Sequence, residues 1–532
     1  MTGTPRPKLV VVVSVDQFCQ DYLVRFADNL AKNNGLVAEV RKQGLEFAEC
    51  HHRHAFTVTA PGHSVQLTGA YPNVNGIVGN DWFDVITGGD RYCVEDNSVQ
   101  VVGIPTGKGM SPRSLLVETV GDSLKRTYPQ AKVFGIAVKD RAAILMSGHR
   151  ANCAFWMASD NWVTSTYYRN DLPAYLRILN EGKMLERYRG TTWDLLLPKE
   201  KYVNTVAPDK NDWENAPAKY TTDFPHKLYG KDEGKPDDFA DQVLFSPFGN
   251  EVTLQGARAV VEGEQLGKDE VPDLLTINLS SNDYVGHAFG PDSLEVEDMT
   301  YRTDRMLKEF TDFLNEHVGA GQWVLALTAD HGVAPIVEFA KLNKLPAERN
   351  PLGGTKELAE KLTKILRDEL SLAEEIKPIE KVTDGQIYLR HGKEGIAGSK
   401  RAAAAKIVRD YLLNQDKIAT AVTREDVLSA SQNPLHAALS RACHPQRSGD
   451  VLFVYRPYAV PGTKGTTHGS PWRYDTHVPL LLIGPGIPQG ETRYEPVSPA
   501  HLAATVAKIF GCATPTAAVE PALTLRPGRE GR

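Results

Sequence analysis

Short apolar runs alternate along this chain with segments of helical periodicity, and this alternation limits its fold more than any other feature. The runs suit buried strands, since each is short and bounded by polar or turn-forming residues. They are Lys8–Val15, Ala131–Val138, Asp273–Leu279, Trp323–Thr328 and Val478–Ile483. Strand–helix–strand alternation is typical of α/β proteins with a mostly parallel central sheet and helices on both faces. In such sheets, ligands bind outside the carboxyl ends of the strands.

The segments between the runs predict the covering helices. Ser111 followed by Pro112 indicates a helix start, with Leu115, Leu116, Val120 and Leu124 on its apolar face. Apolar residues recur at helical spacing over 299–314, and Ser498-Pro499 opens a last helix.

Two stretches break this rhythm within a single domain that spans residues 1–532. Residues 168–250 are rich in aromatic residues, Pro, Asp and Lys, which indicates a decorated insertion. Residues 342–446 contain two polar amphipathic helices, near Thr355–Leu370 and Lys400–Leu413, which indicates an inserted subdomain. Either insertion is long enough to cover a site at the ends of the strands.

Composition excludes several classes of function. The formal net charge is −6 and no long Lys/Arg tract occurs, so we expect no nucleic-acid partner. The aliphatic run Leu9–Val13 is too short to span a bilayer, and Met1–Lys8 lacks the apolar segment of a signal peptide. The six cysteines are sparse and form no CxxC pair, so isolated buried thiols are the favoured interpretation, with one or two disulfides left open.

Carboxylates and imidazoles gather after the predicted strands. A lone Asp after a strand is more often a turn former than a ligand, and a single His is often structural. Their joint occurrence is harder to explain in that way. The residues concerned are Asp16, Asp283, His287, Asp330, His331 and His468. Because zinc takes both nitrogen and oxygen ligands, this mixture of Asp and His predicts a zinc centre.

Thr59 lies before Ala60-Pro61, at the predicted start of a helix. The structural interpretation is that it caps the helix. The functional one is a nucleophile at a helix N-terminus, where backbone donors favour an anion. A free Thr hydroxyl is a weak nucleophile, and metal coordination is one of the few ways to activate it near neutral pH. A nucleophilic Thr59 therefore requires the metal ligands described above.

Three consecutive motifs in this region resemble the nucleophile region of the alkaline phosphatase superfamily. They are Thr57-Val-Thr-Ala-Pro-Gly-His63, Leu67-Thr-Gly-Ala-Tyr-Pro72 and Gly76-Ile-Val-Gly-Asn80. The chain is most similar to bacterial monomeric alkaline phosphatases of the PafA type, with nucleotide pyrophosphatase/phosphodiesterases as more distant cousins. The resemblance extends in order from Asp16 to about Gly484.

The resemblance implies a role for each matching residue. Thr59 would be the nucleophile that becomes phosphorylated. One zinc ion would be held by Asp16, Thr59, Asp330 and His331. A second zinc ion would be held by Asp283, His287 and a later histidine, for which the Thr-His-Gly setting favours His468 over His477.

Three further residues are implied to bind the phosphoryl group. Asn80 would contact a non-bridging phosphate oxygen, and Lys139-Asp-Arg141 resembles the Lys-x-Arg pair that marks the PafA type. Taken alone, Lys139 and Arg141 fit a solvated turn after a strand. Beside two metals, fixed cations would stabilise the greater charge of a monoester dianion. The pair therefore favours monoesters over diesters.

The sequence thus predicts a zinc-dependent alkaline phosphatase acting on small phosphate monoesters through a phosphothreonine, with slower action on diesters. The resemblance also implies a monomer that is periplasmic or secreted, without a membrane partner. Two alternatives stay open: a phosphodiesterase of the nucleotide pyrophosphatase kind, and a zinc-bound pseudo-phosphatase scaffold, against which the intact Thr59 argues. A sulfatase is disfavoured, since Thr59-Ala-Pro-Gly-His63 lacks the Arg of the sulfatase motif.

Overall fold

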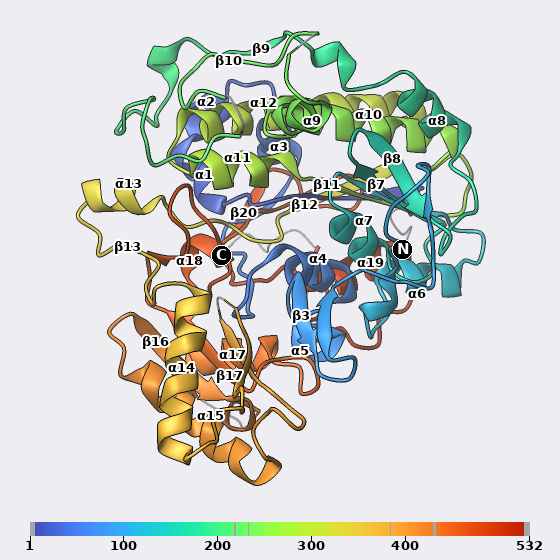
Figure 1. The fold of residues 1–532 in the computed structure, drawn as a ribbon. Helices are drawn as coiled ribbons and strands as arrows, with labels where there is room; N and C mark the ends of the chain where they lie inside the picture. Colours follow the sequence, from blue (N-terminus) through green and yellow to red (C-terminus); the bar gives the residue numbers. More distant parts are fainter. Residues whose placement is uncertain (1–5, 218–219, 232, 384, 429–431, 526–532) are drawn as a thin grey trace, which may run out of the picture.

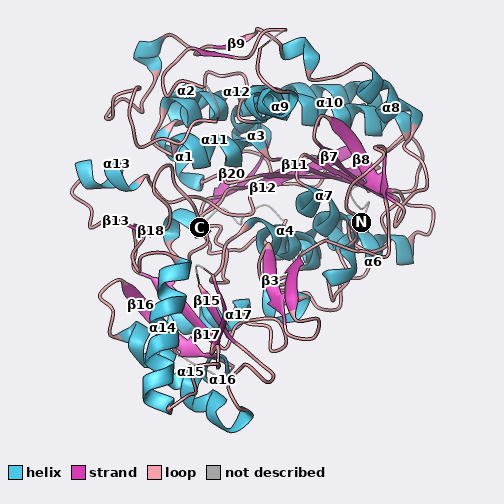
Figure 2. Cartoon of the chain, in the orientation of Figure 1, coloured by secondary structure: helices cyan, strands magenta, loops and turns pink. Residues whose placement is uncertain are grey.

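The computed structural model describes residues 6–217, 220–231, 233–383, 385–428 and 432–525. Its centre is a ten-stranded sheet in the order β20-β2-β19-β12-β1-β11-β6-β7-β8-β5 (Figures 1 and 2). The five adjacent strands at its middle run parallel. They are β12 (Trp323–Thr328), β1 (Leu9–Val15), β11 (Asp273–Leu279), β6 (Val133–Ala137) and β7 (Cys153–Ala158).

The strands outside this parallel centre include antiparallel pairings. β19 is antiparallel to both β12 and β2, β20 is parallel to β2, and β8 is antiparallel to β7 and β5. Their bounds are β19 (Leu480–Ile483), β2 (Gly44–Phe47), β20 (Glu491–Arg493), β8 (Asn161–Ser165) and β5 (Val101–Val102). The prediction of a mostly parallel sheet is therefore confirmed for its centre, and the strand expected at Val478–Ile483 runs against its neighbours.

Helices cover both faces of the sheet, as the alternation predicts (Figure 1). One face carries α3 (Leu36–Gln43), α10 (Pro247–Gly263), α11 (Ser281–Phe289) and α12 (Leu294–Leu314). The other face carries α4 (Thr59–Thr68), α6 (Val120–Thr127), α7 (Asp140–Ser147) and α19 (His501–Phe510). β1, β11 and β12 are buried along their whole length, because side chains on both of their faces meet helices.

The prediction that an α-helix begins at Ser111 is wrong. Residues Pro112–Ser114 form a 3₁₀ turn, after which Leu115 is extended. The α-helix α6 begins instead at Val120, behind a capping box in which Thr119 and Asp122 bond each other's backbone amides. That reciprocal cap satisfies two amides at once and sets the helix boundary.

A second sheet lies apart from the first, in the order β14-β15-β17-β16 (Figure 2). Its strands are β14 (Ile379–Val382), β15 (Gln386–Leu389), β17 (Val451–Tyr455) and β16 (Ile418–Thr423), and α14 (Thr355–Leu370) and α15 (Gly398–Leu413) pack on it. These elements share a hydrophobic core of their own. β17 lies beyond residue 446, where the subdomain was expected to end, so this unit extends further along the chain.

Residues 168–250 contribute α8 (Ala174–Glu181), β9 (Thr192–Trp193), β10 (His226–Lys227), α9 (Pro236–Leu244) and the start of α10. Leu176, Trp193 and Phe239 join the main hydrophobic core. All six cysteines are free thiols, in accordance with the favoured interpretation. No helix among the described residues has the length and hydrophobicity to cross a membrane.

Candidate metal centre and nucleophile

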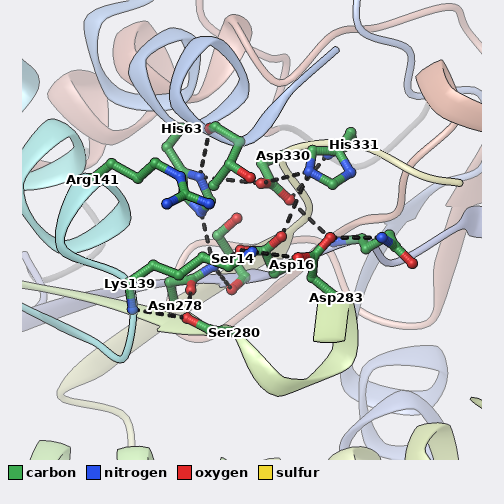
Figure 3. Close-up of polar contacts among 12 residues, drawn as sticks. Ser14, Asp16, His63, Lys139, Arg141, Asn278, Ser280, Asp283, Asp330 and His331 are labelled. Carbon is green, nitrogen blue, oxygen red and sulfur yellow. Dashed lines mark hydrogen bonds and ion pairs between the residues drawn. The ribbon is translucent and has the colours of Figure 1, made fainter. Parts of the chain in front are cut away.

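The structure brings six of the predicted residues together in two groups. Asp16, Asp330 and His331 form the strand-end cluster, and Asp283, His287 and His468 form the helix-loop cluster. Within each group the potential ligand atoms lie within 4.8 Å of one another. Figure 3 shows Asp16, Asp283, Asp330 and His331 converging with Lys139 at one edge of the sheet.

The strand-end cluster is fully buried. Asp16 directly follows β1, and Asp330 and His331 stand two and three residues beyond β12, its parallel neighbour. His331 Nε2 lies 3.2 Å from Asp330 Oδ2 and 3.6 Å from Asp16 Oδ1. The three polar atoms that face one another have no hydrogen-bond partner among the described residues: Asp16 Oδ1, Asp330 Oδ2 and His331 Nε2. Buried polar atoms of this kind are costly unless they coordinate a ligand, so this donor set fits a metal ion.

The helix-loop cluster combines a helix with a distant loop. Asp283 and His287 lie four residues apart on α11, so both face the same side of the helix. Asp283 Oδ1 lies 3.2 Å from His287 Nε2 and 3.6 Å from His468 Nε2. His287 is 35% exposed, unlike the ligand set of the strand-end cluster. Two imidazoles and a carboxylate form a donor set that zinc accepts.

All three histidines are oriented in the same way. The Nδ1 atom of each ring lies within hydrogen-bond distance of a backbone oxygen: 2.7 Å from Thr466 for His287, 2.9 Å from Gly332 for His331 and 2.8 Å from Thr57 for His468. A protonated Nδ1 leaves Nε2 with its lone pair, and each Nε2 points into its cluster. Backbone support of this kind is typical of metal-binding histidines.

Burial and the neighbouring charges shift the pKa values in the two clusters. Burial, followed by the charge of Asp330, raises the pKa of Asp16 to about 7. Burial lowers the pKa of His331, but the Asp330 carboxylate outweighs it and raises this pKa to about 9. Burial, His331 and His287 together hold the pKa of His468 well below its usual value. These opposed shifts show how strongly the buried charges interact.

Thr59 is the first residue of α4 and is almost fully buried. Its helix packs closely on the strand-end cluster, because a side chain at Gly62 would come within 2.1 Å of the backbone oxygen of Asp330. Two residues before Thr59, the backbone oxygen of Thr57 holds His468. The segment that carries Thr59 is therefore in contact with both clusters.

The structure places Asn80 beside Thr59. Asn80 Oδ1 accepts a hydrogen bond of 2.8 Å from the backbone amide of Ala60, the residue that follows Thr59. Asn80 also lines a cleft of about 360 Å³ together with His287 and His468. The cleft extends to Phe453, Tyr455 and Trp472, so the second sheet forms its far wall.

Lys139 and Arg141 follow β6 and differ in their surroundings. The Lys139 ammonium lies between the two clusters, 3.0 Å from Asp16 Oδ2 and 2.6 Å from Asp283 Oδ2. Burial opposes its charge, but these carboxylates outweigh burial and raise the pKa of Lys139 well above its usual value. Arg141 donates to the Tyr92 hydroxyl over 3.2 Å and leaves Nε without a partner among the described residues.

A network of hydrogen bonds, which the sequence did not predict, supports the two clusters. Asn278 donates to His63 Nε2 over 2.8 Å, and His63 Nδ1 lies 2.8 Å from the backbone oxygen of Thr59 and 3.2 Å from Asp330 Oδ2 (Figure 3). Gln17 donates to Asp283 Oδ1 over 2.6 Å. The available signals were the position of His63 in the nucleophile motif and of Gln17 next to Asp16, but neither indicates which group it contacts.

A third group contains Glu49, His51 and His477. Its two imidazole rings are stacked nearly parallel with centroids 4.3 Å apart, and Arg473 pairs with Glu49. Parallel stacked rings cannot both direct a lone pair at one ion, so we assign no metal site here. His477 Nε2 lies 2.7 Å from the backbone oxygen of Ala48, in accordance with the choice of His468 as the ligand.

Comparison with known proteins identifies the family. Residues 10–477 match the family model described as type I phosphodiesterase / nucleotide pyrophosphatase. The chain belongs to this family.

Individual relatives extend the match over nearly the whole chain. The protein is 36% identical to alkaline phosphatase PafA of Elizabethkingia meningoseptica over 99% of this chain and 96% of the relative. It is 34% identical to a protein of Myroides odoratus named calcium-transporting ATPase, over 95% and 92% of the two chains. The crystal structure of wild-type PafA matches with a TM-score of 0.87 and 32% identity, covering 99% of this chain and all of that one. The resemblance to the alkaline phosphatase superfamily and the fold expected from it are both confirmed.

Proposed function

We propose that the protein is a zinc-dependent alkaline phosphatase that hydrolyses small phosphate monoesters through a phosphothreonine at Thr59. The family and the named relatives support hydrolysis of phosphate esters, since an alkaline phosphatase and an ATPase both break a bond to phosphorus. The observation that carries the proposal is the pair of adjacent metal-ligand clusters with Thr59 on the helix that packs against them.

Asp16, Asp330 and His331 would hold one zinc ion with Thr59, and Asp283, His287 and His468 would hold the other. When bound, two such ions act as Lewis acids that favour the ionised nucleophile and neutralise charge on the transferring phosphoryl group. The N-terminus of α4 directs its partial positive charge toward the same region. Asn80, fixed by the Ala60 amide, would hold a non-bridging phosphate oxygen.

The reaction would proceed in two displacements. In the first, a bond forms between Thr59 Oγ and phosphorus while the bond from phosphorus to the alcohol oxygen breaks, and the alcohol leaves with a proton. In the second, the oxygen of a water molecule bonds to phosphorus, the bond to Thr59 Oγ breaks, a proton of that water returns to Thr59 Oγ, and phosphate leaves. Lys139 and Arg141 would bind the dianionic phosphoryl group in both steps.

A phosphodiesterase remains the second candidate, because the matching family model is named for that activity. We favour the monoesterase because Lys139 contacts a carboxylate of each cluster, and Arg141 supplies a second cation close enough to act on the charge of Lys139. We further propose that the enzyme acts as a monomer and is exported to the periplasm or medium.

The test compares Thr59→Ala with Thr68→Ala on the same helix. Thr68 bonds the backbone oxygen of Ser64 and lies away from both clusters in the helix. Thr59→Ala should lower kcat/KM for an aryl phosphate by at least about 10³-fold while its zinc content falls little, and Thr68→Ala should stay within several-fold of wild type. Undiminished turnover in Thr59→Ala would overturn the assignment of the nucleophile.

A further inference from the structure

Asp475 is a buried carboxylate on the short helix α18 (Arg473–Thr476) and belongs to neither ligand cluster. In the view of Figure 1, α18 lies between the central sheet and the second sheet. Oδ2 of Asp475 accepts three hydrogen bonds: from the amide of Gly469 over 3.1 Å, from the amide of Ser470 over 2.8 Å and from the Ser470 hydroxyl over 2.5 Å. This one oxygen therefore holds the two residues that directly follow His468.

The loop that Asp475 holds is also tied to the segment that carries Thr59. The Thr57 hydroxyl donates to the backbone oxygen of Ser470 over 2.8 Å, and the backbone oxygen of Thr57 lies 2.8 Å from His468 Nδ1. Gly469 has a φ of 118°, which favours glycine and leaves the backbone free to change its path. The orientation of the His468 ring therefore depends on hydrogen bonds to the loop rather than on the stiffness of the loop.

The backbone of Asp475 reaches the other cluster. Its oxygen accepts a hydrogen bond of 2.7 Å from the amide of Gly332, which directly follows His331. The two segments approach closely, because a side chain at Gly332 would come within 2.2 Å of the backbone oxygen of Tyr474. The rings of His331 and His468 are stacked, with centroids 3.4 Å apart. Asp475 thus contacts the chain beside one histidine of each cluster.

We propose that Asp475 is a positioning residue that holds His468 against His331 and so sets the affinity of the helix-loop cluster for its metal ion. The inference rests on the proposed function, in which His468 Nε2 binds that ion. Groups that orient a metal ligand typically contribute about 10–100-fold to metal affinity. A carboxylate suits this role, because one of its oxygens can accept several donors at once.

A purely electrostatic role for Asp475 is the alternative. The negative charge of a buried carboxylate near two metal ions would also favour their binding. The two roles differ in whether asparagine can replace the residue. Oδ2 accepts all three hydrogen bonds, and Oδ1 has no partner among the described residues. Asparagine can therefore place its oxygen at the Oδ2 position and keep the hydrogen bonds without the charge.

The first measurement is the zinc affinity of the full chain, determined by competition with a chelator. In Asp475→Ala, one zinc ion should bind about 10–100-fold more weakly than in wild type, and in Asp475→Asn within several-fold of wild type. Asp273→Ala is the matched control and should also stay within several-fold. Asp273 is equally buried, accepts hydrogen bonds from the amides of Lys132 and Gly267, and starts β11 at the end of the strand away from the clusters.

The second measurement is amide hydrogen exchange in the metal-free protein, which does not depend on zinc. Asp475→Ala should speed exchange at Gly469 and Ser470 by at least about 10-fold, because both amides lose their acceptor, whereas Asp475→Asn and Asp273→Ala should exchange as wild type does. Ser470→Ala removes only the hydroxyl bond and should weaken the same zinc ion by several-fold. This milder variant decides the question if Asp475→Ala does not fold.

Three results would overturn the proposal. Zinc affinity and exchange in Asp475→Ala that match wild type would show that the loop does not need Asp475. An equal loss of zinc in Asp475→Asn would assign the effect to charge, and an equal loss in Asp273→Ala would assign it to general destabilisation. Wild type that binds two zinc ions but hydrolyses no phosphate ester would contradict the proposed function alone, since neither measurement uses activity.

Discussion

The strand-end cluster and the helix-loop cluster present similar candidate metal ligands on different supports. Asp16, Asp330 and His331 follow adjacent parallel strands and are completely buried. His287 is 35% exposed, and His468, whose side chain is 6% exposed, comes from a loop held through a backbone oxygen. The central sheet therefore assembles one group of candidate ligands by itself, whereas the second group depends on segments brought together from distant parts of the sequence.

The largest expected effect tests the strand-end cluster. Asp330→Asn should remove one of the two zinc ions and lower kcat/KM for a monoester by about 10³-fold or more, because it takes charge from a fully buried site. Elemental analysis of the purified variant and steady-state kinetics measure the two quantities. Retention of both zinc ions with near-normal activity would break the assignment of this cluster.

A smaller effect is expected at the loop that carries His468. His468→Ala should lower zinc content by one ion and activity by about 10²-fold, since Asp283 and His287 would retain a weakened site. His477→Ala is the matched control, because it removes a nearby histidine that bonds the backbone oxygen of Ala48. Loss of zinc in His477→Ala, with zinc retained in His468→Ala, would reverse the choice between the two.

A third prediction concerns the cations that lie between or beside the clusters. Lys139→Ala and Arg141→Ala should each lower monoester turnover by about 10–10²-fold and leave diester turnover much less affected, because a diester has less charge on its non-bridging oxygens. The ratio of kcat/KM for an aryl monoester and an aryl diester measures this. An unchanged ratio would favour the phosphodiesterase alternative.

The smallest effect concerns Glu214, whose chain neighbours form backbone hydrogen bonds with Gly465 and Ala288, close to His468 and His287 in the chain. Burial, followed by the charge of Glu295, raises the pKa of Glu214 from 4.5 to about 10, so the folded protein retains a proton that the unfolded chain releases. The contribution of this group to stability is therefore present below about pH 4.5 and is lost as pH rises toward 10. Between pH 6 and pH 9, Tm should fall more in wild type than in Glu214→Gln, because Gln cannot ionise. An equal fall in both proteins would contradict this.

The sequence predicted the strand-end cluster well for a physical reason. The apolar runs Asp273–Leu279 and Trp323–Thr328 coincide with β11 and β12, because strands buried on both faces are apolar throughout and are followed by polar residues. Parallel neighbours then bring Asp16 and Asp330 to one edge. The residues of β19 do not determine its direction in the sheet, because that direction depends on the path of the preceding chain.

The remaining features depend on contacts between distant residues. His468 was chosen over His477 from its sequence setting, but the bond that orients it comes from Thr57, far away in the sequence. Gln17 has a positive φ of 61° and reaches Asp283 across 266 positions, which no local pattern signals. Glu214 and Glu295 likewise interact from separate segments, so these buried acids look like ordinary surface residues in the sequence.

Anomalous diffraction at the zinc edge from crystals of the active enzyme would show directly whether two zinc ions lie beside Thr59. Two ions activating Thr59 predict two strong peaks, one among Asp16, Asp330 and His331 and the other among Asp283, His287 and His468, with Thr59 Oγ in reach of the first. A fully active protein with no peak at either cluster, or with Thr59 remote from both peaks, would contradict the account.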